Sequence, residues 1–444
     1  MADIDDLPLP TAMGDLLMVA DESLMKGTWK WYVDKAVDEN AAGERNVKDS
    51  LLYSGISAKL PTKLHMLTMA ESQHGKTFLE TQMGMVLFPS IFEDITEISP
   101  KAMYYEVREK QNPHLYDGKI VMIDELSDMS DLLRQFVKKA TTNDRKRLTL
   151  KTVEDQKYRE MTIEGLPVVW TNTYELVEDA GNQLHNRFFK VNHENTDEQG
   201  DAVEIMQQEQ STFGRRCDES PAVTAARHII NKILDRNNKK RPLVLNPFGR
   251  QICETEHGRR NRRPMLDALI SSITYANRFL CPTFEDDETL LVLTTLTDIR
   301  EGMAIYEANE EAQRTSTPEY LTRFLKLFEP EEWLTKYELS ARTEKKWGEA
   351  MSAESCYVYA HDLEKKNLLT SRKRIDELSG LETRAFEYAP LSLNDSKTFI
   401  LDSNFANREL LAKTVKEQIE RSLKAFTETR ESGISVIVDR LLTK

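Results

Sequence analysis

The residues that could do chemistry begin with a glycine–lysine–threonine triplet at the end of a short loop. A strand-like apolar run, 64–69, precedes the loop, and a helical run follows it. Backbone N–H groups of such a loop bind phosphate oxygens. The lysine neutralises the phosphates and the threonine hydroxyl is a ligand for Mg²⁺, so this order of strand, loop and helix predicts a P-loop. The predicted loop residues are Ala70, Glu71, Ser72, Gln73, His74, Gly75, Lys76 and Thr77.

Two acidic residues follow a second apolar run, Ile120–Ile123. Asp124 lies 48 residues after Lys76, and carboxylates in this position would lie where open parallel sheets bind ligands. We predict that Asp124 holds Mg²⁺ and that Glu125 orients an attacking water, because phosphoryl transfer needs a positioned nucleophile. Taken by itself, an acidic pair of this kind is also an ordinary strand end.

Two further polar residues extend this set of candidates. A third strand-like run, 168–171, ends next to Asn172, whose amide could sense the γ-phosphate and hold the water. An asparagine in a plain strand-to-turn junction is the alternative. Arg187 lies 15 residues further on, between apolar neighbours. It could stabilise transition-state charge at a neighbouring subunit's nucleotide, or form a salt bridge at a helix end.

These motifs, in this order, resemble those of an AAA+ ATPase. Between the acidic pair and Asn172, residues 147–163 predict two alternating strands joined by a turn at 154–157. This insertion is similar to the pre-sensor-1 hairpin of superfamily-3 and minichromosome maintenance helicases. A closer resemblance is to helicase-like ATPase modules attached to primases of prokaryotic mobile elements. The segments that carry it are 98–105, 186–192 and 262–273.

The resemblance covers about residues 45–390 and implies an α/β fold. Its parts are a P-loop AAA+ core of mostly parallel sheet with helices on both faces, a helical lid and a C-terminal winged helix. Arg263, beside Arg262, would be a second sensor of bound ATP, with a solvated basic loop as the alternative. The chain departs from the P-loop pattern at Ala70, where the first glycine is expected. No primase catalytic segment is visible.

The predicted organisation has five parts. They are an N-terminal extension (1–44), the ATPase core (45–200) with its inserted hairpin (147–163), a helical lid region without strands (201–328), a winged-helix domain (329–395) and a C-terminal helical tail (396–444). Within the tail, residues 405–430 predict an amphipathic helix, either a subunit clasp or a solvated tail.

Nucleic-acid contacts are predicted at two places. Lys157 lies at the tip of the hairpin, and Arg372, Lys373 and Arg374 lie at the wing of the winged helix, where basic residues contact phosphates. The candidate recognition helix, 352–366, carries three acidic residues and no arginine. Contact with a protein is therefore the alternative role of this domain.

The amino-acid composition excludes further classes of protein. The formal net charge is −14, which argues against a protein that coats nucleic acid with its whole surface. No apolar run is long enough for a transmembrane helix, and the acidic N-terminal segment predicts no secretory signal. The four cysteines are far apart and predict reduced thiols of a cytoplasmic protein.

Two functions from different classes remain open. The first is an ATP-hydrolysing ring motor, a homo-hexameric DNA helicase or translocase in the replication of a prokaryotic mobile element. It would hold single-stranded DNA in its channel, with a primase or polymerase as a candidate partner. The second is an ATP-dependent regulatory switch or DNA loader whose winged helix recruits a protein partner.

Overall fold

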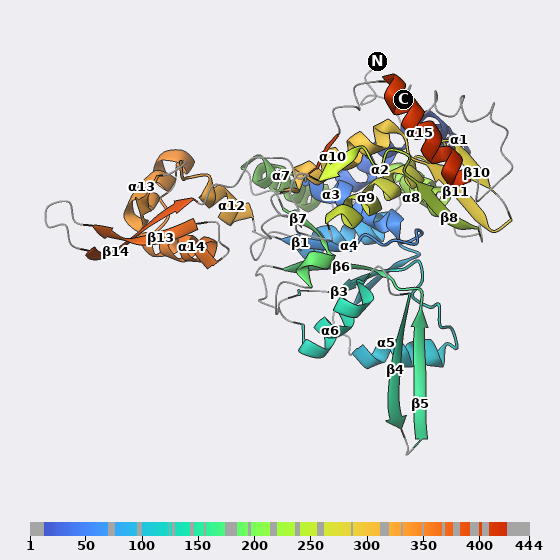
Figure 1. The fold of residues 1–444 in the computed structure, drawn as a ribbon, viewed down its shortest axis with the longest axis horizontal. Coiled ribbons are helices and arrows are strands. Elements are labelled where there is room, and N and C mark those ends of the chain that lie inside the picture. The colour runs from blue at the N-terminus through green and yellow to red at the C-terminus, as the bar shows by residue number, and fades with distance from the viewer. Residues whose placement is uncertain are drawn as a thin grey trace.

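A five-stranded parallel sheet lies at the centre of the computed structural model (Figure 1). Its strand order is β2-β3-β6-β1-β7, and all four pairings are parallel. The strands are β1 (Met66–Met69), β2 (Phe92–Ile95), β3 (Ile120–Ile123), β6 (Val168–Thr173) and β7 (Phe189–Asn192). The structure describes residues 13–69, 76–95, 100–123, 125–126, 129–142, 146–154, 157–173, 184–193, 197–213, 220–235, 240–254, 262–285, 287–310, 319–329, 332–348, 350–365, 369–375, 382–390, 399–401 and 408–423.

The apolar runs of the sequence predict three of these strands, and the structure confirms them. β3 has the predicted bounds, β1 begins two residues later than predicted, and β6 extends two residues further, to Thr173. The runs do not predict β2 or β7. β2 is an edge strand that carries Glu93 and Asp94, and β7 carries Lys190, so neither is a continuous apolar run.

Helices cover both faces of the sheet, as predicted. Successive strand residues point to opposite faces, and the apolar core divides in the same way. Met66 and Trp170 pack in one cluster with the helices α3 and α4. Leu67 and Val169 pack in a second cluster with α5 and α6. The bounds are α3 (Arg45–Ser57), α4 (Lys76–Leu87), α5 (Pro100–Glu109) and α6 (Asp131–Ala140).

The first helices of the chain belong to this same body. Their apolar side chains share the larger core cluster with three helices from the region 221–308. Trp29 is buried, and its indole N–H donates to Asn277 Oδ1 at 2.9 Å. Residues 13–38 are therefore packed into the main body. The helices concerned are α1 (Met13–Lys26), α2 (Trp29–Asp38), α8 (Pro221–Leu234), α9 (Arg262–Ala276) and α10 (Leu296–Ala308).

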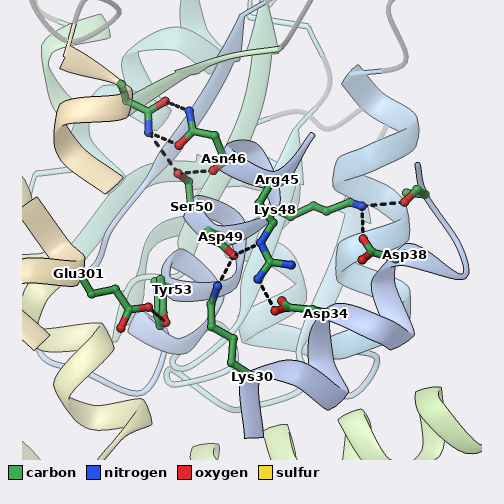
Figure 2. Close-up of polar contacts among 12 residues, drawn as sticks. Lys30, Asp34, Asp38, Arg45, Asn46, Lys48, Asp49, Ser50, Tyr53 and Glu301 are labelled. Carbon is green, nitrogen blue, oxygen red and sulfur yellow. Dashed lines mark hydrogen bonds and ion pairs between the residues drawn. The ribbon is translucent and has the colours of Figure 1, made fainter. Parts of the chain in front are cut away.

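A polar network around α3 fixes these helices relative to one another (Figure 2). Asn46 and Asn309 exchange two hydrogen bonds, of 2.7 and 2.9 Å, between α3 and α10. The hydroxyl of Tyr53 donates to Glu301, and burial raises the pKa of both side chains. Such contacts restrict α3 to one position because each buried polar group needs its own partner. The ion pairs between α2 and α3 are Lys48–Asp38, Lys30–Asp49 and Arg45–Asp34.

The prediction that the helical lid region, 201–328, has no strands is wrong. A three-stranded sheet, β10-β11-β8, lies in this region, and β9 pairs with a strand near residue 400. These strands have three to five residues, and β9 forms only by pairing with a segment distant in sequence, so periodicity could not reveal them. The elements are α7 (Asp197–Phe213), β8 (Arg241–Leu245), β9 (Ile252–Glu254), β10 (Thr283–Glu285), β11 (Thr289–Leu293) and β15 (Phe399–Leu401).

The predicted hairpin is present and projects away from the sheet (Figure 1). Strands β4 (Arg147–Glu154) and β5 (Lys157–Glu164) pair antiparallel over their full eight residues, which is a length of about 27 Å. Its base is anchored, because Leu148 and Met161 are buried in the core against α5 and α6. Near its tip, Val153 and Tyr158 face each other and are 70% and 61% exposed.

Residues 319–390 form a separate small unit with its own apolar core (Figure 1). Three helices pack with a three-stranded antiparallel sheet of order β12-β14-β13. A helix begins at Lys336, because Thr335 and Glu338 form a capping box there. Ser352 caps the next helix, since its hydroxyl accepts from the backbone N–H of Ser355 at 3.1 Å. The elements are α12 (Glu319–Leu325), β12 (Leu334–Thr335), α13 (Lys336–Trp347), α14 (Ala353–Lys365), β13 (Leu369–Ile375) and β14 (Glu382–Pro390).

The last helix that the structure describes is α15 (Arg408–Leu423). It lies inside the segment predicted to be an amphipathic helix. Val415 and Ile419 are fully buried in the main core cluster, so this part of the segment packs on the body and is not a solvated tail. Of the helices in the described parts of the chain, none is long and apolar enough to cross a membrane.

The packing of α3 against the sheet layer gives a testable prediction. A Cβ added at Gly55 would lie 2.4 Å from the ring of Phe88, which is itself buried. We expect Gly55→Ala to lower the free energy of unfolding by about 1–3 kcal/mol through overpacking. The matched control is Gly200→Ala in α7, where nothing lies within 4 Å; it should stabilise by about 0.5–1 kcal/mol. Thermal unfolding of both variants measures this, and equal midpoints would contradict the close packing.

Candidate functional site

Three strands of the central sheet bring their carboxyl ends to one edge, as the sequence predicts. Met69 pairs with Thr173, and Ile123 pairs with Thr171, so β1, β3 and β6 end side by side. α4 begins at Lys76, after the loop that follows β1. The described polar residues at these strand ends and at the start of α4 therefore lie at this edge, where open α/β sheets bind ligands.

Asn172 and Thr77 are brought together at this edge. The amide Nδ2 of Asn172 donates to Glu80 Oε2 at 2.9 Å and lies 3.3 Å from Thr77 Oγ1. Thr68 on β1 donates its hydroxyl to the other carboxylate oxygen of Glu80, at 2.7 Å. One carboxylate of α4 is thus bonded to residues of both β1 and β6.

Glu80 is fully buried, as are Thr68 and Asn172. A buried carboxylate is costly unless hydrogen-bond donors surround it, and here two neutral side chains donate to it. The side chains of Thr68 and Asn172 are consequently held in place by their hydrogen bonds to this carboxylate. The threonine at the start of α4, by contrast, is exposed and accessible to a ligand. The sequence reasoning missed Glu80, although its spacing of one helical turn from Thr77 places both on one face of the helix.

Glu125 lies beside the same strand end. The backbone N–H of Leu126 donates to the carbonyl of Asn172 at 2.7 Å, which binds the acidic loop after β3 to β6. The Glu125 side chain is half-buried. The predicted water-orienting acid and the predicted sensor amide are therefore held on adjacent strands by a main-chain contact.

On the other side of β1, a buried histidine adjoins the loop. The backbone N–H of His193 donates to the carbonyl of Met69, the last residue before the predicted P-loop, at 3.0 Å. Its ring Nδ1 lies 3.2 Å from a carboxylate oxygen of Glu44. Both side chains are buried. No sequence signal could have found this pair, because its members are 149 residues apart and neither belongs to a motif.

Some predicted site residues lie outside the described residues. They are the loop from Ala70 to Gly75 (with Glu71, Ser72, Gln73 and His74 between them), Asp124, and the side chains of Lys76 and Lys157. Their predicted roles in binding phosphate, Mg²⁺ and DNA stay predictions.

Arg187 lies at the opposite edge of the sheet. It belongs to the short 3₁₀ helix His185–Arg187, which precedes the first residue of β7. A strand of four residues is about 13 Å long, so this arginine is well separated from the loop edge of its own chain. Its guanidinium donates to the carbonyl of Lys138 and to the hydroxyl of Thr142, at the end of α6. The first of these bonds satisfies a carbonyl in the last turn of α6.

Arg263, the predicted second sensor of ATP, forms hydrogen bonds within its own region. Arg263 donates to Asp267 and to the carbonyls of Ile252 and Gly249, at 2.9, 2.6 and 2.7 Å. The two bonds to carbonyls fasten α9 to the segment around β9, and the bond to Asp267 lies within α9. They hold Arg263 in place within its own region, and its predicted contact with ATP stays a prediction.

In the small unit, the basic triplet lies inside strand β13. Arg372 donates to Glu387 at 3.0 Å and stacks on Trp333, and Arg374 lies 3.6 Å from the same carboxylate. Lys373 is exposed between them. One glutamate of β14 therefore offsets two of the three predicted phosphate contacts.

Comparison with known families agrees with this geometry. Residues 18–236 match the family model described as the MTBMA_p00010 P-loop domain. This segment is a P-loop domain. The P-loop domain begins within α1 and ends two residues after α8, so it takes in the N-terminal helices that share its core. Its class is that of nucleotide-binding NTPases. A comparison with curated proteins gives no match.

The oxygen donors at the carboxyl edge fit the Mg²⁺ that usually accompanies such a nucleotide. Mg²⁺ is bound by oxygen, usually through one or two protein ligands together with substrate phosphates and water. The exposed hydroxyl of Thr77 is one such donor, and the amide of Asn172 lies beside it. A hydroxyl oxygen of this kind suits a hard cation.

The contact between Asn172 and Glu80 gives a second prediction. Asn172→Asp would place a second carboxylate about 2.9 Å from the buried one, and one of the two pKa values must rise. We expect this substitution to lower the free energy of unfolding by about 3 kcal/mol at neutral pH. This destabilisation should be smaller at about pH 5 than at about pH 7.5. The reason is that a carboxyl group with a raised pKa favours the folded state only at pH values at which it binds the extra proton.

Thermal unfolding at both pH values measures this effect. The matched control is Asn112→Asp, at an exposed turn where the side-chain oxygen only accepts from the backbone N–H of His114. If the two variants had the same pH dependence, Asn172 would not be in contact with an ionised Glu80.

Proposed function

We propose that this chain is an ATP-hydrolysing motor that moves on nucleic acid, most simply a DNA helicase or translocase acting as a homo-oligomeric ring. The observation that carries the proposal is the meeting of Thr77, Asn172 and the Glu125 loop at one edge of a P-loop domain. The inserted hairpin supports the step from ATPase to motor.

We assign to the residues the roles that their sequence motifs predict. The loop after β1, together with Lys76, would bind the nucleotide's phosphates, and Thr77 and Asp124 would hold Mg²⁺, which offsets phosphate charge. Glu125 would accept a hydrogen bond from the attacking water and orient it toward the γ-phosphate. Asn172 would donate to the γ-phosphate, and its bond to Glu80 restricts the amide to one orientation.

A ring explains the place of Arg187. From the opposite edge of the sheet it could not act on its own chain's nucleotide without a large movement, but it could act on that of a second copy. A guanidinium supplied in trans stabilises transition-state charge. Closed cyclic symmetry would give every subunit such a neighbour.

The hairpin has the features of an element that contacts a nucleic-acid strand. It extends beyond the body, and it exposes the aromatic ring of Tyr158 next to Lys157. An exposed aromatic ring can stack on bases of any sequence, while a lysine contacts phosphate. One such tip per subunit would suit repeated binding and release.

The small unit, 319–390, supports a second candidate function. Its elements run in the order helix, strand, two helices and two strands, which supports the proposal of a winged helix. Glu387 pairs with Arg372 and Arg374, which weakens the case for a phosphate-binding wing. This pairing favours a regulatory switch or DNA loader, in which the unit recruits a protein partner such as a primase or polymerase.

Hydrolysis is tested first. Glu125→Gln should still bind ATP but hydrolyse it about 10²–10⁴-fold more slowly, because an amide cannot serve as the water's proton acceptor. Lys76→Ala should instead lose nucleotide binding. The control is Glu344→Gln on an exposed face of α13, which should hydrolyse normally. Steady-state ATPase and nucleotide-binding assays measure both effects, and an unchanged rate in Glu125→Gln would refute the assignment.

A variant at the hairpin tip distinguishes the proposed motor from the proposed switch. Lys157→Ala should keep basal ATPase and oligomer size but lose the stimulation by single-stranded DNA and the unwinding activity. Lys151→Ala is the matched control, since this lysine lies lower on the same hairpin and pairs with Glu160 at 3.6 Å. Full unwinding by the Lys157 variant at moderate salt would remove the hairpin from the mechanism and favour the switch.

A further inference from the structure

A pocket of about 750 Å³ lies at the amino edge of the central sheet. Its lining includes His65, Gly118 and Leu166, which precede β1, β3 and β6 respectively. These are the strands whose other ends form the candidate nucleotide site. The pocket is therefore separated from Thr77 and Asn172 by the length of the strands, and it is a different site.

The lining of this pocket is strongly basic. It has six lysines and arginines against two acidic residues, so its formal charge is 6 − 2 = +4, in a chain whose net charge is −14. Two of the basic pairs lie 94 residues apart in sequence, at 146–147 and 240–241, and only the fold joins them. The charged residues are Lys59, Lys63, Lys146, Arg147, Lys240, Arg241, Asp117 and Glu164.

Several of these cations have no acidic partner. Among the residues that the structure describes, Lys146, Arg147 and Arg241 are exposed and form no ion pair. Glu164, the ladder partner of Arg147, is engaged instead by His114 at 3.5 Å. Uncompensated like charges around one concavity repel each other and create a positive potential that attracts anions.

Lys63 lies deeper in the same pocket. Its side chain is 13% exposed, its Nζ donates to the carbonyl of Ala58 at 2.6 Å, and the carboxylate of Asp117 is 3.9 Å away. Burial, opposed by Asp117 and assisted by the nearby Lys59, lowers the pKa of Lys63 to about 8. An anion in the pocket would favour the charged ammonium, so the deepest cation also gains from such a ligand.

We propose that this basic pocket is a second phosphate-binding site, which takes a chain of phosphate groups through Lys63, Arg147 and Arg241. Guanidinium and ammonium groups are the usual ligands of phosphate, and the volume is within the range of small-ligand sites. The site goes beyond the proposed ATPase, because binding there requires no hydrolysis.

Two ligands could supply such a row of phosphate groups. One is the backbone of single-stranded nucleic acid, since Arg147 is the first residue of the hairpin that leaves the pocket's rim. The other is the triphosphate of a nucleotide held by a second copy of the chain, since Arg187 bonds to Thr142, which lines the pocket. Both present several phosphates in a row.

The test uses the full chain with Lys76→Ala, so that the P-loop site contributes little. The probe is inorganic tripolyphosphate, titrated by calorimetry. Arg147→Glu combined with Arg241→Glu should weaken its binding by at least about tenfold, because two charge-assisted contacts are lost. Lys345→Glu combined with Lys413→Glu makes the same charge change at exposed positions elsewhere and should leave binding unchanged. Equal binding by the two double variants would overturn the proposal.

Two further measurements, made with intact Lys76, identify the source. If nucleic acid is the ligand, the double variant should bind oligothymidine more weakly, and the slope of log affinity against log salt should fall by about 1.4, or 0.7 per lost contact. If the ligand is a second copy's nucleotide, oligothymidine binding should persist while ATP-dependent self-association is lost. The calorimetric result stands even if the chain proves not to hydrolyse ATP, so failure of the ATPase proposal would be seen separately.

Discussion

The buried carboxylate of Glu80 is the charge on which the carboxyl edge of the sheet depends. It comes from α4, and hydroxyl and amide donors from β1 and β6 bond to it. Because an unsatisfied buried carboxylate would cost several kcal/mol, this charge restricts how α4 can approach the two strands. The start of α4, where Thr77 is exposed, is then fixed relative to Asn172.

The central sheet has a different chemistry at each of its edges. At the carboxyl edge, neutral hydroxyl and amide donors surround the carboxylate of Glu80. At the amino edge, Arg187 and the basic pocket collect positive charge. Strands of four residues keep these two regions about 13 Å apart. One subunit could therefore hold a nucleotide at one edge while it presents cations to a different phosphate ligand at the other.

The N-terminal helices and the region 221–308 act as one scaffold around α3. Apolar packing supplies the stability of this body, since the larger core cluster runs through all of these helices. The polar contacts in Figure 2 determine how the helices are arranged. The paired asparagines and the Tyr53–Glu301 bond require one arrangement of α3 and α10. Partly buried polar contacts add little net stability but penalise alternative packings.

The sequence by itself determined the local features of this protein. Apolar runs defined β1, β3 and β6, alternation defined the hairpin, and residue types placed Lys76, Thr77, Glu125 and Asn172 on the correct strand ends and helix start. Such features depend on neighbours within one element, and periodicity records them. Tertiary structure alone decided the rest. The pairing of β9 with β15, the Thr68–Glu80–Asn172 contacts, the burial of His193 with Glu44 and the meeting of two distant basic clusters in one pocket all join segments far apart in the chain. Their physical reason is the packing of helices on both faces of the sheet, which no local pattern of residues encodes.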